Sequence, residues 1–183
     1  SAGLLFISFE WLRAFVFHGR ETVQVFTAGA KPPFSINLQM GREEAFFTLM
    51  INAVGLLGGF YLFDRLKKTG SHAMSVFIVL IMGLNGMVLT RDIFNLFVFM
   101  EIATIATAGL IVLTREDRPL AAGFKYMIAA GIISGFLLLG IIFIYYFGGT
   151  LNIDVLQGAG LTAVKGGLLA LFMIVIALLL ELK

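Results

Sequence analysis

Residues Ile93–Thr114 read IFNLFVFMEIATIATAGLIVLT and contain a single charged side chain, Glu101. The stretch is long enough to cross a bilayer as one helix, which needs about 20 apolar residues. Arg91 precedes it, and Glu101 lies about 15 Å farther along the helix axis, close to the membrane midplane. An ionised carboxylate at that depth costs at least about 2.5 kcal/mol. We therefore expect Glu101 to be paired, protonated or hydrated, and each of these states suits a site that handles protons or ions.

The composition of the whole chain is that of a membrane protein. Of its 183 residues, 60% are hydrophobic and 13% are charged, and the mean hydropathy is +1.00. A soluble domain carries about 25% charged residues. The net charge of +2 is too small to indicate nucleic-acid binding. The sequence contains no cysteine, which excludes disulfides, thiolate metal sites and cysteine-held iron–sulfur clusters.

Five apolar stretches predict membrane helices by their length and low charge content. They are residues 45–63, 72–90, 93–114, 120–148 and 164–182. Residues 1–17 are a sixth candidate, interrupted by Glu10 and Arg13, and we interpret them as the tail of a truncated membrane helix. The predicted fold class is an all-α membrane protein, a polytopic helical bundle of about five to six transmembrane helices. Residues 45–183 form its main part.

Residues 18–44 have a different pattern. The alternating segments 22–26 and 34–38 flank a turn with Gly29 and two prolines, which predicts a β-hairpin outside the bilayer. The short loops 64–71 and 115–118 carry more Lys and Arg than the short loops at the other end of the helices. By the positive-inside rule, these two loops are predicted to be cytoplasmic and the hairpin external.

Lys125 is a second charge inside an apolar stretch. It lies about 9 Å into the helix that Pro119 opens. Its side chain can extend to the headgroups at the membrane surface, or it can be a buried lysine that relays protons. Because its helix and that of Glu101 are consecutive and antiparallel, the two side chains can face one another.

Several polar residues are candidates for supporting roles. Thr104 shares a helix face with Glu101 and can hold its carboxylate or bind water beside it. Asp92 is expected to cap the helix that follows it. His72 opens a helix near the cytoplasmic face, where an interfacial histidine is more common than a proton donor. Asn52 and Asn85 are expected to form hydrogen bonds between helices. Close helix contacts are expected at Gly55, Gly58, Gly59, Gly83 and Gly86.

The sequence contains no recognisable catalytic constellation. There is no nucleotide-binding loop, and the two histidines do not have metal-site spacing. We therefore predict no catalytic residues, no cofactor and no metal for this chain.

Four short motifs occur in the order found in one family of membrane proteins. They are residues 31–38 (KPPFSINL), 92–102 (DIFNLFVFMEI), 121–126 (AAGFKY) and 149–152 (GTLN). As a set, they make the chain resemble the antiporter-like subunits shared by Mrp-type Na⁺/H⁺ antiporters, membrane-bound hydrogenases and respiratory complex I. The resemblance covers nearly the whole chain and is strongest with the D-type subunit of the Mrp antiporters and its hydrogenase relatives. It implies a partial antiporter-like fold, because the second, inverted repeat of the family lies outside this sequence.

The resemblance also implies roles for individual residues. Glu101 matches the family's glutamate on the fifth helix, and Lys125 matches a lysine on the sixth. Lys183 falls about where the family has a seventh-helix lysine that pairs with the glutamate, and Glu181 is a supporting candidate beside it. Counting along a straight helix from Val164 instead places Lys183 about 28 Å away, near the far interface, where it would be a stop-transfer charge.

The implied function is ion translocation, of H⁺ with Na⁺ as a further candidate, by a subunit of a multi-subunit complex in the cell membrane. The distance between Glu101 and Lys183 would set the proton affinity of the lysine, and Lys125 would pass protons on. The expected partners are other membrane subunits and the lipid bilayer. Two alternatives remain open. One is a non-conducting structural subunit, and the other is an energy-converting subunit of a hydrogenase or quinone oxidoreductase whose redox centres sit in partner subunits.

Overall fold

The computed structural model describes residues 2–17, 21–27, 35–114, 119–159 and 166–181. The longer helices are α1 (Ala2–Phe17), α2 (Arg42–Tyr61), α4 (Ser71–Leu89), α5 (Ile93–Thr114), α6 (Pro119–Gly148) and α8 (Gly167–Glu181). The short elements are helices α3 (Phe63–Thr69) and α7 (Ile153–Ala159) and strands β1 (Val23–Phe26) and β2 (Asn37–Met40).

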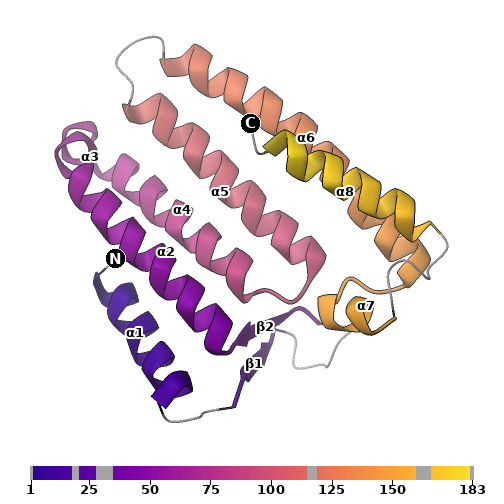
Figure 1. Cartoon of the computed structure of the whole chain (residues 1–183). Coiled ribbons are helices and arrows are strands. Elements are labelled where there is room, and N and C mark those ends of the chain that lie inside the picture. The colour runs from indigo at the N-terminus through magenta and orange to yellow at the C-terminus, as the bar shows by residue number, and fades with distance from the viewer. Residues whose placement is uncertain (1, 18–20, 28–34, 115–118, 160–165, 182–183) are drawn as a thin grey trace.

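The longer helices form a row in which each helix packs against its neighbours in the sequence (Figure 1). The contacts run from α1 to α2, α4, α5, α6 and α8 in that order. The hairpin and α7 lie at one end of the long helices, and α3 and the C-terminal end of α5 lie at the opposite end. Because the row is open, apolar side chains such as Val54, Ile105 and Ile132 remain exposed. Such exposure is expected where lipid or further membrane segments surround the helices.

Four of the described helices, α2, α4, α5 and α6, are long and apolar enough to cross a membrane. The sequence predicted about five to six such helices. The difference arises at the two ends of the row. The described part of α8 is apolar but has only 15 residues, and α1 carries Glu10 and Arg13, which form an exposed ion pair of 3.6 Å. The prediction of an all-α, multi-pass membrane protein is confirmed.

The predicted hairpin is present, but two short helices were not predicted. Strands β1 and β2 pair antiparallel, with Val25 opposite Leu38, and β2 begins a few residues later than expected. The predicted loop 64–71 largely forms α3, which ends at Gly70, where the positive φ of 98° favours glycine. Helix α7 was also missed, because a single short helical segment has too few residues to show a periodic apolar pattern.

The predicted asparagine bonds between helices are confirmed. The amides of Asn52 in α2 and Asn85 in α4 are bonded to each other in both directions, at 3.1 and 3.4 Å. Asn52 Nδ2 also donates to Ser8 Oγ of α1 at 2.8 Å. These bonds connect three neighbouring helices and satisfy polar groups that would otherwise be costly in an apolar environment.

Glycine allows the closest approach between α4 and α5. A Cβ added at Gly83 would lie 3.1 Å from the carbonyl oxygen of Phe99, and one added at Gly86 would collide with the Phe99 ring. Gly55 of α2 is in a similar position, with Ile81 of α4 only 2.7 Å from an added Cβ. The predicted close contacts at these glycines are therefore confirmed, and α5 is held tightly against α4.

Three chain segments meet beside the hairpin, at that end of the long helices, and we call their meeting place the junction. They are residues 37–38 of β2, residues 90–92 before α5 and residues 151–153 at the start of α7. The middle segment is bonded on both sides, because Arg91 N donates to Asn37 O (3.0 Å) and Arg91 O accepts from Ile153 N (2.9 Å). Asn152 Nδ2 donates to Asn37 Oδ1 at 2.9 Å, and both side chains are buried. The junction therefore fixes where α5 begins.

Helices α5 and α7 begin with the same local geometry. The Asp92 carboxylate accepts a hydrogen bond from the backbone N–H three residues later (2.8 Å), and its own N–H donates to Thr90 Oγ1 (3.2 Å). Asn152 is bonded in the same way to the N–H of Val155 (3.1 Å) and to Thr150 Oγ1 (3.2 Å). Both residues are N-caps, as predicted for Asp92.

Replacing Asn152 by Ala should lower the thermal stability of the protein. The change removes the cap of α7 and leaves the buried Asn37 Oδ1 without its bond from Asn152, which together should cost about 1–3 kcal/mol. The measurement is the melting temperature of the purified protein in detergent. Gln157→Ala, at an exposed position of α7, is the control. Equal melting temperatures for the two variants would show that the junction does not depend on Asn152.

Candidate functional site

Glu101 lies in the middle of α5 and is half-buried. The hydroxyl of Ser134 in α6 donates a hydrogen bond to its Oε1 atom. Met100, which precedes Glu101 in the sequence, and Ile133, which precedes Ser134, pack into an apolar cluster formed by α5, α6 and α8. A carboxylate in such an environment needs a polar partner, because burial without one is costly. In this structure, Ser134 is that partner, and the sequence analysis did not single it out.

Of the two supporting roles that the sequence suggested for Thr104, the bond to the Glu101 carboxylate is not formed, and the binding of water stays a prediction. Thr104 is half-buried one turn after Glu101, but within the described ranges its hydroxyl forms no hydrogen bond with the Glu101 carboxylate. Thr107, farther along the same helix, bonds to the carbonyl oxygen of Ala103 in its own backbone (2.8 Å). The spacing between Glu101 and Thr104 identified their shared helix face, but it could not identify α6 as the helix whose serine supplies the hydroxyl.

Lys125 does not lie beside Glu101. It lies about two and a half turns before Ser134, a spacing that puts the two side chains on opposite faces of α6. It also lies about 14 Å along the axis from the Ser134 level, close to Gly123, where α6 contacts Val112 of α5. The Lys125 side chain is exposed. The structure therefore gives no support for contact between the Lys125 and Glu101 side chains, and the relay role of Lys125 stays a prediction.

The remaining sequence candidates are spread over the row. His72 is exposed at the start of α4, and Asp92 is used as the cap of α5. Glu181 is the last residue of α8, and Lys183 lies outside the described residues. The predicted pairing of Glu101 with Lys183 stays a prediction. Over the part of the chain that the structure describes, no three His, Asp or Glu side chains are grouped as a metal site would require.

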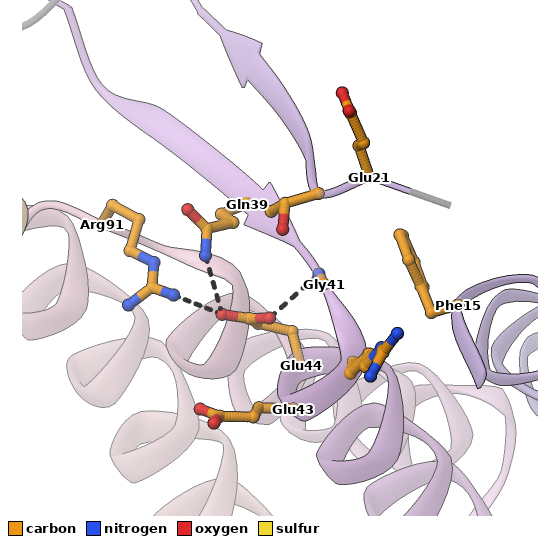
Figure 2. Close-up of a pocket in the computed structure, with 9 residues that line it drawn as sticks. Phe15, Glu21, Gln39, Gly41, Glu43, Glu44 and Arg91 are labelled. Carbon is orange, nitrogen blue, oxygen red and sulfur yellow. Dashed lines mark hydrogen bonds and ion pairs between the residues drawn. The ribbon is translucent and has the colours of Figure 1, made fainter. Parts of the chain in front are cut away.

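A second polar centre, also missed from the sequence, surrounds Glu44 at the first turn of α2. Figure 2 shows three groups converging on its carboxylate. Arg91 Nη2 forms an ion pair with Oε1 at 2.5 Å, Gln39 Nε2 donates to the same oxygen at 3.2 Å, and Gly41 N donates to Oε2 at 2.9 Å. Glu44 is 7% exposed. The available signal was its position three residues after the helix cap, where Glu often bonds back to the cap.

The Glu44 centre lines a cavity of about 550 Å³ at the hairpin end of the long helices (Figure 2). Glu21, Arg42 and Glu43 also line this cavity, and Glu101 does not. The bond between Glu44 and Arg91 connects the first turn of α2 to the residue in the middle of the junction. It therefore has a structural role in positioning α5.

The first comparison with known proteins concerns the region of the chain that contains Glu101. The family model described as "NADH:quinone oxidoreductase/Mrp antiporter, TM" matches residues 90–182. The chain belongs to this family. The matched region contains α5, α6, α7 and α8, so it includes Glu101, Ser134 and Lys125. The hairpin and Glu44 lie before it. The resemblance inferred from the four sequence motifs is confirmed.

Individual members of the antiporter family show the same similarity. The chain is 36% identical over 120 residues to a probable K(+)/H(+) antiporter subunit, of the D type, from Rhizobium meliloti (strain 1021). It is 34% identical over 126 residues to the D-type Na(+)/H(+) antiporter subunit of Bacillus subtilis (strain 168). These alignments cover 66% and 68% of this chain but only 22% and 26% of the relatives. The chain thus spans about a quarter of the length of these curated relatives.

A solved structure extends the similarity to nearly the whole row. It is that of the membrane-bound sulfane sulfur reductase, an archaeal respiratory membrane complex. One of its chains is 33% identical to this one, with a TM-score of 0.80, over 97% of this chain and 37% of that chain. Family membership and the helices of the described row together make this chain a multi-pass membrane protein, and a location in the cell membrane agrees with its bacterial relatives.

Replacing Arg91 by Ala should destabilise the protein strongly, because it leaves the buried Glu44 carboxylate without its cation. Removing one partner of a buried pair costs about 3–5 kcal/mol, and we expect the lower end because Arg91 is 27% exposed. The measurement is a double-mutant cycle of melting temperatures with Glu44→Ala. Arg42→Ala, at an exposed position lining the same cavity, is the control. If the Arg91 and Glu44 losses add independently, the two residues are not coupled.

Proposed function

We propose that this chain is part of an antiporter-like subunit that translocates protons, with Na⁺ as a second candidate ion, within a multi-subunit membrane complex. The observation that carries the proposal is the position of Glu101. Its carboxylate is half-buried in the middle of an apolar helix, and a hydroxyl of the next helix bonds to it. The names of the two antiporter relatives support the proposal independently.

In the proposed mechanism, Glu101 is the group that takes up and releases the transported cation. A carboxylate between apolar helices has few competing partners, so the gain or loss of one proton changes its interactions strongly. Lys183 remains the proposed partner of Glu101, following the family resemblance. The proton occupancy of that lysine would depend on its distance from the Glu101 carboxylate.

Lys125 remains a proposed pathway residue, but with a different route from the one first expected. Its exposed position on the opposite face of α6 means that protons would reach it along the outside of this helix and not by contact with Glu101. The alternative is an interfacial lysine whose ammonium group extends to the membrane surface.

A second candidate function is energy conversion in a redox-driven complex. It is favoured by the similarity to a chain of the archaeal sulfane sulfur reductase, which covers nearly all of this chain. Ion translocation by Glu101 would be the same in both cases. The difference would lie in the partner subunits, which would supply electron transfer in the redox-driven complex.

Glu101→Gln should reduce ion transport by at least about tenfold, because the amide cannot exchange a proton at working pH. The measurement is the formation of a pH difference in vesicles that contain the protein assembled with its natural membrane partners. Asp154→Asn, which removes the same charge at an exposed position of α7, is the control and should transport normally.

Normal transport by the Glu101→Gln variant, at an equal amount of assembled protein, would contradict the proposed function. It would favour the interpretation of this chain as a non-conducting structural subunit.

A further inference from the structure

Ser134 differs from other hydroxyl residues in the helices of this chain. A serine or threonine within a helix commonly bonds to a carbonyl oxygen three or four residues earlier in its own backbone. The side chains that do so here are Ser8, Thr48, Thr69, Ser75 and Thr107. Thr69 Oγ1 also donates to the backbone carbonyl oxygen of Leu113 in α5, at 3.5 Å. The Ser134 hydroxyl instead donates to a side chain of a different helix, the Glu101 carboxylate. Its position therefore serves the carboxylate and not the geometry of α6.

The contact lies where α5 and α6 run side by side (Figure 1). Ser134 is half-buried, and Ile133 and Leu137 of α6 pack with Met100 and Phe97 of α5 in the apolar cluster beside it. Within the described ranges, the Glu101 carboxylate has no other hydrogen-bond partner. The orientation of the carboxylate therefore depends on one hydroxyl group.

A hydroxyl suits a carboxyl group that changes its protonation state. It has one hydrogen to donate and two lone pairs that accept, and it can rotate between these roles. It can donate to the ionised carboxylate and, after a rotation, accept from the protonated acid. An ammonium side chain at this position would only donate, and an alanine would offer neither function.

We propose that Ser134 is the positioning residue for Glu101, holding its carboxyl group in one orientation through both protonation states. The proposal rests on the proposed function, because it assumes that Glu101 handles the transported ion. Ser134 is not itself a carrier of the ion. It acts by keeping the Glu101 carboxyl group aligned between α5 and α6.

The test compares Ser134→Ala with Ser134→Thr in the vesicle transport assay, with the protein in its natural assembly. Loss of a hydrogen bond to a charged group should slow transport of the Ala variant by about tenfold. The Thr variant keeps the hydroxyl and should transport within about twofold of the wild type. Ser75→Ala on α4, which removes an exposed hydroxyl bonded to its own helix, should leave transport unchanged.

A second measurement uses the Glu101→Asp variant, whose carboxylate is withdrawn from Ser134 by one methylene group. In this background, Ser134→Ala should cause little further loss, because the bond is already broken. Wild-type transport by Ser134→Ala would overturn the proposal, as would a full additional tenfold loss in the Asp background. If Glu101→Gln abolishes transport while Ser134→Ala does not affect it, only the role of Ser134 fails. If Glu101→Gln transports normally, the proposed function fails.

Discussion

The position of α5 depends on the hydrogen bonding of the short segment that precedes it. Arg91 is bonded through its backbone to β2 on one side and to the start of α7 on the other, and its side chain pairs with the buried Glu44. One residue thus connects the hairpin, α2, α5 and the chain leading to α8. Since a helix rises about 1.5 Å per residue, fixing its first turn also fixes the depth of every later side chain. The position of Glu101 along the row of helices is therefore set at the junction, about 15 Å away.

The same arrangement explains how an apolar row can hold a carboxylate. Close contacts at Gly83 and Gly86 hold α5 against α4, and the apolar cluster with α6 and α8 holds its other side. Between these contacts, Ser134 supplies a hydroxyl at the level of Glu101. A carboxylate of this kind costs free energy unless it is bonded, and the Ser134 hydroxyl supplies that bond.

The sequence predicted those features that depend on one segment at a time. The length of the apolar stretches predicted the membrane helices, and the alternation of polar and apolar residues predicted the hairpin. The absence of other charges around Glu101 identified it as a candidate functional residue. It missed the short helices α3 and α7, and of the contacts between segments it predicted the Asn52–Asn85 bonds and the glycine contacts but not the bonds of Glu101 and Glu44. Ser134 is an ordinary serine in an apolar helix until its neighbour is known, and Glu44 lies among several charged residues at a helix start. The helix face that Lys125 occupies became clear only from its spacing to Ser134, once the bond between Ser134 and Glu101 was known.

The proposed function requires that Glu101 change its protonation state during transport. It is tested most directly by infrared difference spectra of the assembled complex, recorded across the pH range in which transport occurs. We expect a carboxyl band that appears and disappears over this range, that is absent from the Glu101→Gln variant and that persists in Asp154→Asn. A Glu101→Gln spectrum identical to that of the wild type would show that Glu101 does not exchange a proton during transport, and it would contradict the proposed function.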